Sequence, residues 1–189
     1  PFLGLRGLRL SLARPEVFRV QLRALARAAA RGDLRIMLPM VTAPRELDTA
    51  RAILDEVVAE LQAAGIEAAL APLGMMVEVP AAALTAASFA ADFYSIGSND
   101  LVQYVMAASR DNPHVAPLYD PGNPAVLALI RRVVEVANAR GLEVSLCGDM
   151  ASDTAYLPSL LRLGLRNISV TPAQLGPVKA AIAAWPPRR

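Results

Sequence analysis

Cysteine, histidine and lysine are almost missing from this chain of 189 residues. Cys147 is the only cysteine, His114 the only histidine and Lys179 the only lysine. A lone cysteine excludes a disulfide framework and any metal site built from cysteines, and it fits the reducing cytoplasm. His114 lies in a polar loop without a carboxylate at helical or strand spacing, so we expect a loop residue with no catalytic role.

Long runs of charge or of uninterrupted apolar residues are missing as well. The net charge is +2 and no run of basic residues exceeds two, which argues against nucleic-acid binding. Between residues 68 and 91 only Glu78 is charged, but Pro72, Gly74 and Pro80 interrupt that stretch. We expect a buried strand followed by a helix there, and no insertion into a membrane.

The composition that remains is that of a globular chain, with 54% hydrophobic, 19% charged and 5% aromatic residues. Eleven glycines and 15 prolines are spread along the sequence, which excludes collagenous and low-complexity classes. The chain begins at Pro1 rather than at methionine, and we therefore expect a fragment of a longer protein.

A stripe of arginines is predicted on the first long helix. Four arginines recur at every fourth residue, at positions 19, 23, 27 and 31, opposite an apolar face. The stripe is either a solvated helix face or a docking surface for an acidic partner, and the pattern alone leaves both open.

Short apolar strands alternate with helices along the whole chain. The pattern predicts strands at residues 34–38, 73–79, 92–96, 142–147 and 167–170. It predicts helices at residues 15–31, 44–64, 81–90, from 98 onward, 125–139, 154–163 and 173–184, after a turn-rich start and around a polar loop at 111–124. Because a helix follows each strand, we expect a parallel sheet.

Polar residues at the strand ends favour a barrel over an open sheet. Glu78, Asn99-Asp100, Cys147 and Asp149 lie where strands pass into loops, which is how a (β/α)8 barrel builds its active site. An open sheet would concentrate such groups at one switch point, and no glycine-rich phosphate loop is present. We predict a TIM-type barrel in the α/β class. A complete barrel needs about 250 residues, so we expect residues 1–189 to form one incomplete domain.

Glu78 and Asp100 are the candidate metal ligands. Glu78 lies in an apolar strand, where a buried carboxylate needs neutralisation or a cation, and Asp100 follows the next strand. Two carboxylates with room for water and ligand oxygens form the oxygen-rich site that Mg²⁺ prefers. The alternative is structural: Ser98, Asn99 or Asp100 caps the following helix and Glu78 pairs with an arginine.

Three arginines outside the stripe are candidates for anion binding. Arg6 and Arg35 lie beside or within apolar segments, and Arg110 opens the long polar loop. The planar guanidinium suits carboxylate and phosphate groups, so these residues either clamp an anionic substrate or serve as structural and surface arginines.

Cys147 ends a strand, with Gly148 beside it leaving room for a substrate. The thiol is either a buried inert group or, if it faces the mouth of the site, an acid or nucleophile.

Five segments of the sequence form one recognisable set: residues 1–9, 34–40, 74–83, 93–103 and Cys147-Gly148. In this order they resemble the phosphoenolpyruvate-binding barrel of the Enzyme I family, the phosphoenolpyruvate-protein phosphotransferases of the bacterial sugar phosphotransferase system. Pyruvate phosphate dikinases and phosphoenolpyruvate synthases share these motifs, and a non-catalytic phosphoenolpyruvate-sensing module is a further alternative.

The resemblance implies a transferase that moves the phosphoryl group of phosphoenolpyruvate to a histidine on an N-terminal domain, releases pyruvate and serves a small phosphocarrier protein. It also implies a homodimer, and it implies that the barrel strands absent from residues 1–189 are the first ones, because the chain opens partway through a family motif. Mg²⁺ would be held by Glu78 and Asp100, and Cys147 would be the proton donor. The substrate would be bound by Arg6, Asn99, Asp100 and Arg110, with Arg35 nearby. The family usually has glutamate where this chain has Asp149, which leaves the support of the site at that position open.

Overall fold

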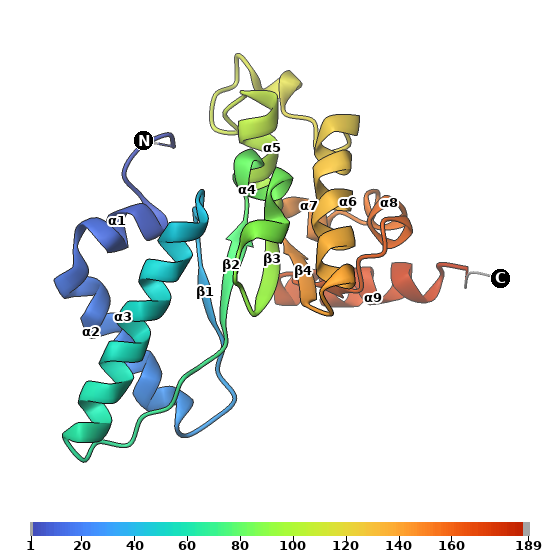
Figure 1. Ribbon diagram of the computed structural model, residues 1–189. Coiled ribbons are helices and arrows are strands. Elements are labelled where there is room, and N and C mark those ends of the chain that lie inside the picture. Colours follow the sequence, from blue (N-terminus) through green and yellow to red (C-terminus); the bar gives the residue numbers. More distant parts are fainter. Residues whose placement is uncertain (1, 187–189) are drawn as a thin grey trace.

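Residues 2–186, which the computed structural model describes, fold around a parallel sheet of five strands. The strands are β1 (Ile36–Leu38), β2 (Leu73–Val77), β3 (Phe93–Gly97), β4 (Glu143–Cys147) and β5 (Asn167–Ile168). They lie in the order β1-β2-β3-β4-β5, and every neighbouring pair is parallel (Figure 1). The predicted α/β class with a parallel sheet is therefore confirmed.

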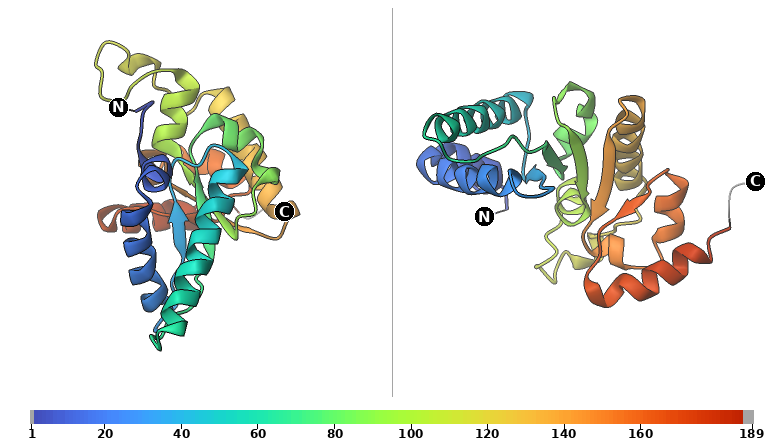
Figure 2. Two further views of the ribbon diagram at one scale, coloured as in Figure 1. Left: turned by 60° about the vertical axis from the view of Figure 1, so that its left-hand side comes forward. Right: turned by 90° about the horizontal axis from the view of Figure 1, so that it is seen from below.

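Helices flank the sheet along its length. They are α1 (Gly7–Ala13), α2 (Pro15–Ala29), α3 (Pro44–Ala63), α4 (Pro80–Leu84), α5 (Ser98–Met106), α6 (Pro124–Ala139), α7 (Asp149–Ser152), α8 (Leu157–Arg162) and α9 (Leu175–Ala183), with 3₁₀ turns η1 (Ala86–Ser88), η2 (Ala116–Leu118) and η3 (Pro172–Gln174). Figure 2 shows α2 and α3 side by side next to β1, and α6, α8 and α9 at the other side of the sheet.

The starts of several helices follow from local chemistry. Pro15, Pro44 and Pro124 open α2, α3 and α6, where a missing N–H costs nothing and the fixed φ suits a helix. The Asn123 side chain accepts the N–H of residue 125 at 2.9 Å and so caps α6. These signals explain why the long helices match the predicted ranges to within about two residues.

Three predicted segments differ from the structure. The start of the chain was expected to form turns because of its glycines, but it contains α1. Burial of Leu8 and the hydrogen bond from its N–H to the Pro39 carbonyl (3.0 Å) stabilise this helix. The predicted helix 81–90 is divided into α4 and η1. The predicted helix 154–163 is wrong at its start, since α7 begins directly after β4 and α8 begins only at Leu157.

The arginine stripe of α2 pairs largely within the chain. Arg19 forms ion pairs with Glu56 and Glu60 of α3, Arg23 pairs with Glu60, and Arg31 pairs with Glu67. The opposite face of α2 is buried against the core. The stripe is thus a half-solvated helix face in which two arginines pair with α3 and a third pairs with Glu67, which lies beyond the end of α3. Such pairs add little stability.

The core lies between the sheet and the helices. Tyr94 of β3 is 1% exposed, and its hydroxyl donates to the Ala86 carbonyl (2.8 Å) while accepting from Arg140, the residue after α6 (2.8 Å). The buried phenol is therefore satisfied on both sides, as a polar group in a core has to be. Within residues 2–186, none of the helices combines the length and the apolarity that a membrane crossing requires.

Gly74 in β2 gives a test of the packing. A Cβ at this position would lie 2.5 Å from the ring of Phe93, whereas a Cβ at Gly32 meets no atom within 4 Å. We expect Gly74→Ala to lower the free energy of unfolding by about 1–3 kcal/mol, because the ring has to move. Urea unfolding followed by circular dichroism measures the change, with Gly32→Ala as the matched control. Equal stability of both variants would contradict this packing.

Candidate active site at the carboxyl ends of the strands

The carboxyl ends of β2, β3 and β4 meet at one edge of the sheet. The register pairs Val77 with Ile96 and Gly97 with Cys147, so the residues that follow each strand lie at one level. Glu78 follows β2, Asp100 lies in the first turn of α5, and Cys147 ends β4. Three of the residues singled out from the sequence are thus brought to the same edge.

Glu78 is a buried carboxylate, 5% exposed, held by one short hydrogen bond. Its Oε1 accepts the backbone N–H of Met40 at 2.7 Å. Burial raises the pKa of Glu78 from its usual 4.5 to about 7, and the charge of Asp100 acts in the same direction. The Met40 N–H and the charges of Arg6 and Arg110 oppose that rise. The group is therefore poised to lose its proton near neutral pH.

Asp100 has one paired and one unpaired oxygen. Its Oδ2 accepts from Arg6 Nη2 at 3.1 Å, and Arg6 also contacts the Tyr104 hydroxyl at 3.5 Å. Oδ1 is buried and has no hydrogen-bond partner among the described residues. A buried carboxylate oxygen without a partner is costly, and this one marks a place where a cation or a donor group belongs.

The pair of carboxylates fits Mg²⁺. In the part of the chain that the structure describes, no group of three or more histidine, cysteine, aspartate or glutamate side chains could hold a metal by itself. Mg²⁺ commonly takes one or two carboxylates and completes its shell with water and substrate oxygens. The unpaired Oδ1 of Asp100 and the poised carboxyl of Glu78 are the donors that such a site requires.

Asn99 fixes the turn that follows β4. Its Oδ1 accepts the N–H of Asp149 at 2.8 Å, and its backbone carbonyl accepts from the Tyr119 hydroxyl at 3.1 Å. Gly148 has a φ of +99°, and a Cβ there would lie 2.4 Å from Ser98 Oγ and 2.6 Å from Asn99 Oδ1. Only glycine fits this close approach. The Nδ2 of Asn99 has no partner within residues 2–186.

Cys147 is half-buried and keeps its proton. Its thiol donates to the Ile96 carbonyl at 3.6 Å and accepts a contact from Ser95 Oγ at 3.9 Å. Burial raises the pKa of the thiol, and the charge of Glu78 raises it further, while the Ser95 contact lowers it. A thiol in this state suits the role of an acid better than that of a nucleophile.

Arg110 lies in the exposed loop after α5. Its backbone N–H points to Gln103 Oε1 at 3.4 Å, and its guanidinium forms no ion pair with the described residues. Burial raises the pKa values of both Glu78 and Tyr119, and the positive charge of Arg110 opposes the rise in each. An unpaired arginine whose charge acts on the buried carboxyl group of Glu78 is placed to meet an anionic ligand.

Arg35 does not belong to this site, and its prediction as a substrate-binding residue is wrong. It pairs with Glu143 at 2.6 Å and lies over the Phe93 ring at 5.6 Å. Arg35 comes before β1, while Glu143 and Phe93 begin their strands, so all three lie at the amino ends of the strands. Sequence proximity to an apolar strand did not reveal at which end of it the side chain lies.

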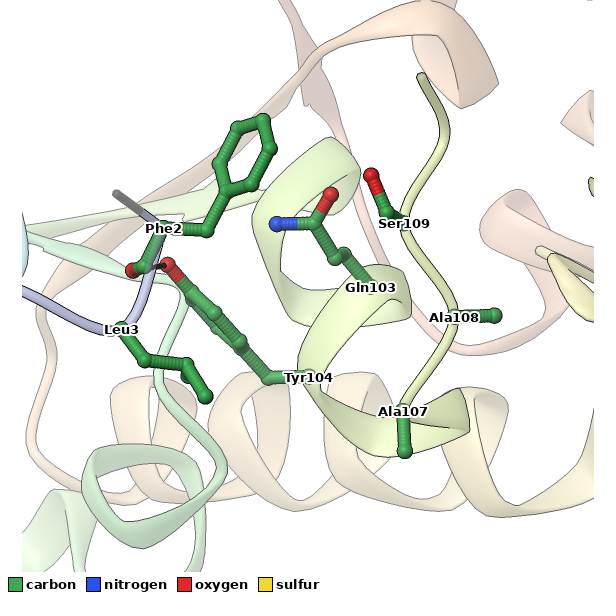
Figure 3. A pocket seen from close by; sticks show the side chains of 7 residues that line it. All are labelled: Phe2, Leu3, Gln103, Tyr104, Ala107, Ala108 and Ser109. Atoms are coloured by element: carbon green, nitrogen blue, oxygen red, sulfur yellow. Dashed lines mark hydrogen bonds between the residues drawn. The ribbon is translucent and has the colours of Figure 1, made fainter. Parts of the chain in front are cut away.

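The residues that sequence reasoning missed are on α5 and in the turn after β1. Tyr104 donates to the Phe2 carbonyl at 2.6 Å and, with Gln103, lines a cavity of about 490 Å³ (Figure 3). Tyr104 follows Asp100 by four residues, which on a helix places both on one face. That spacing was the available signal. Met40 carried none, because its contribution is a backbone N–H.

His114 lies in the loop between α5 and α6, as predicted, and its N–H donates to Asn112 Oδ1 at 3.0 Å.

Comparison with known proteins gives matches over nearly the whole chain. The family described as "PEP-utilising enzyme, PEP-binding domain" matches residues 1–185. The phosphoenolpyruvate-protein phosphotransferase of Geobacillus stearothermophilus is 48% identical over 185 residues, covering 96% of this chain and 32% of that protein. The enzyme of the same name from Bacillus subtilis is 47% identical over 191 residues, with 97% and 33% covered. The chain thus spans about a third of the length of these relatives.

Solved structures share the arrangement of strands and helices at low sequence identity. A citrate lyase from Burkholderia xenovorans superposes with a TM-score of 0.63 at 24% identity, covering 86% of this chain and 53% of that one. A malate synthase from Haloferax volcanii gives 0.61 at 17% identity, with 90% and 51% covered. These likenesses concern the fold alone. The family match over residues 1–185 and the identity to the two phosphotransferases show that this chain belongs to the phosphoenolpyruvate-binding domain family of the PEP-utilising enzymes.

Proposed function

We propose that this chain is the phosphoenolpyruvate-binding domain of a phosphoenolpyruvate-protein phosphotransferase. The observation that carries the proposal is the unpaired buried oxygen of Asp100, beside Glu78 and Arg6, in a chain 48% identical to such enzymes. The whole protein would transfer the phosphoryl group to a histidine on another domain and release pyruvate as the first step of sugar uptake. Its further partner would be a small phosphocarrier protein.

Phosphoenolpyruvate would be held by cationic and amide groups at the strand ends. Arg6 and the unpaired Arg110 would bind its phosphate and carboxylate, because guanidinium groups match both anions. Asn99 would offer its free Nδ2, since its Oδ1 is already fixed by Asp149. Asp149 would support Asn99 through its backbone N–H, so this support would not depend on the length of the side chain at position 149.

Glu78 and Asp100 would hold Mg²⁺ through Oε2 and Oδ1. When bound, the metal supplies positive charge that stabilises the transferring phosphoryl group. Arg6 would neutralise the second oxygen of Asp100 and at the same time orient the substrate. The repulsion between the two negative carboxylates would therefore be offset by the cations and the N–H group that surround them.

Cys147 would donate the proton that completes the reaction. The P–O bond of phosphoenolpyruvate would break as a P–N bond forms to the acceptor imidazole. The electron pair of the broken bond would stay on the oxygen, which gives the enolate of pyruvate. The enolate carbon then takes the proton of the Cys147 thiol, giving pyruvate and a thiolate that regains a proton from water. The raised pKa of the thiol supports this order, because the proton is present when the enolate forms.

The sheet supports a place within a larger barrel. Strands that follow one another in both sequence and space, all parallel, are typical of a (β/α)8 barrel, whereas a doubly wound sheet reverses its strand order. We propose that β1 to β5 are consecutive strands of a TIM-type barrel whose first strands belong to the rest of the protein, so that residues 1–189 are one incomplete domain. A homodimer in the cytoplasm, where the single thiol stays reduced, completes the proposal.

The metal assignment is tested on the whole protein by calorimetry. We expect Glu78→Gln and Asp100→Asn each to abolish Mg²⁺-dependent binding of phosphoenolpyruvate, because each variant loses one of the only two carboxylates proposed to hold the ion. Glu56→Gln, which changes an exposed carboxylate of α3, is the control and should bind normally. Unchanged Mg²⁺-dependent binding in both site variants would defeat the assignment.

The role of Cys147 is tested by separating binding from chemistry. Cys147→Ala should keep the affinity for phosphoenolpyruvate and Mg²⁺ while slowing the release of pyruvate by about 10²–10⁴-fold, the range typical of general acids. A lactate dehydrogenase-coupled assay of the whole protein measures the rate. Full turnover of the variant would make the thiol an inert one, and a covalent adduct trapped on its sulfur would indicate a nucleophile instead.

The raised pKa of Glu78 predicts a pH dependence in the metal-free protein. Its folded-state pKa of about 7 lies above the unfolded value of 4.5, so the folded protein binds more protons between these values. Stability is therefore lost as pH rises through this window, by up to about 3 kcal/mol. The difference in unfolding free energy between wild type and Glu78→Gln, measured from pH 5 to 8 in a chelator, should follow this course. A difference that does not change with pH would contradict it.

A further inference from the structure

Met40, in the turn after β1, has a backbone conformation that residues other than glycine rarely adopt. Its φ is 60°, and Ala107 is the other non-glycine residue with positive φ among those described. Ala107 ends α5, a place where the left-handed conformation is common. Met40 ends no helix and is 2% exposed. A strained residue in a buried turn persists only where the surroundings fix it.

The turn around Met40 is fixed from several sides. The Pro39 carbonyl accepts the N–H of Leu8 at 3.0 Å, and the Met40 carbonyl accepts from Thr42 Oγ1 at 3.4 Å. A Cβ on Gly7 would lie 2.8 Å from the Cβ of Met40, so the first turn of α1 packs directly on this residue. The side chain reaches the Tyr104 hydroxyl, 3.8 Å from its sulfur. The strain is thus held by α1 and α5 together.

This conformation directs the backbone N–H of Met40 towards the carboxylate of Glu78. The N–H donates to Glu78 Oε1 at 2.7 Å, while Oε2 lies beside Gly97 and accepts no hydrogen bond from the described residues. One oxygen of the carboxylate is therefore occupied and the other is left for a ligand. Hydrogen bonds of this kind orient metal-binding carboxylates in proteins.

We propose that Met40 is a positioning residue of the metal site, and that its left-handed backbone, rather than its side chain, keeps Glu78 ready for Mg²⁺. The inference rests on the proposed function of Glu78 as a ligand. It predicts that Mg²⁺ affinity depends on whether residue 40 tolerates positive φ. Glycine does so without strain, a side chain that is not branched at Cβ, such as leucine, behaves like methionine, and a β-branched side chain does so least of all.

The first test compares three substitutions in the whole protein by calorimetry with Mg²⁺ alone. Met40→Gly and Met40→Leu should keep an affinity close to that of wild type, whereas Met40→Val should lower it roughly 10–100-fold, as loss of such an orienting partner does. Ala107→Val is the matched control at the other positive φ and should lower the melting temperature without changing Mg²⁺ affinity. Equal affinities in Met40→Val and wild type, or an equal loss in Met40→Gly and Met40→Val, would overturn the inference.

A second measurement does not require the valine variant to fold. In the whole protein labelled with ¹⁵N-methionine, and assigned by comparison with Met40→Leu, the Met40 amide proton should resonate downfield because of its short bond to a carboxylate. It should move when Mg²⁺ is added. A Met40 signal that stays unmoved at saturating Mg²⁺ would overturn the proposal. Failure of wild type to bind Mg²⁺, or unchanged binding by Glu78→Gln, would instead refute the proposed function, so the two failures are distinguishable.

Discussion

Two buried carboxylates at the ends of neighbouring parallel strands are the constraint on which this structure depends. Glu78 and Asp100 are each 5% exposed and raise the energy of one another's charged form. Two contacts offset this cost: Arg6 forms an ion pair with one oxygen of Asp100, and the Met40 N–H donates to one oxygen of Glu78. Arg6 comes directly before α1 and Met40 lies in the turn after β1, so the site holds together segments that are far apart in the sequence.

Close backbone approach is the second requirement of the same edge. A Cβ at Gly97 would lie 2.8 Å from Glu78 Oε2, and a Cβ at Gly148 would lie 2.4 Å from Ser98 Oγ. Glycine at these positions allows the strand ends, the first turn of α5 and the carboxylate to occupy one small space. The opposite edge of the sheet is built differently. There, exposed ion pairs such as Arg35 with Glu143 and Arg51 with Asp92 join the starts of strands and the flanking helix.

Helix α5 connects these requirements. Its first turn supplies Asn99 and Asp100, and its next turn supplies Gln103 and Tyr104, which contact the loop of Arg110 and the segment before α1. Residues of this helix thus contact the segments that carry Arg6, Arg110 and Asp149.

The sequence by itself determined the alternation of strands and helices, the parallel sheet and the three strand-end residues Glu78, Asp100 and Cys147. It could do so because apolar periodicity and breakers are local, and because polar residues that interrupt apolar strands are conspicuous. Only the tertiary structure decided that Arg35 lies at the far edge, that α1 forms, and that Met40 contributes through its backbone. Each of these depends on contacts between segments that are distant in the chain. The direction of a side chain or of an N–H group cannot be read from the local order of residues.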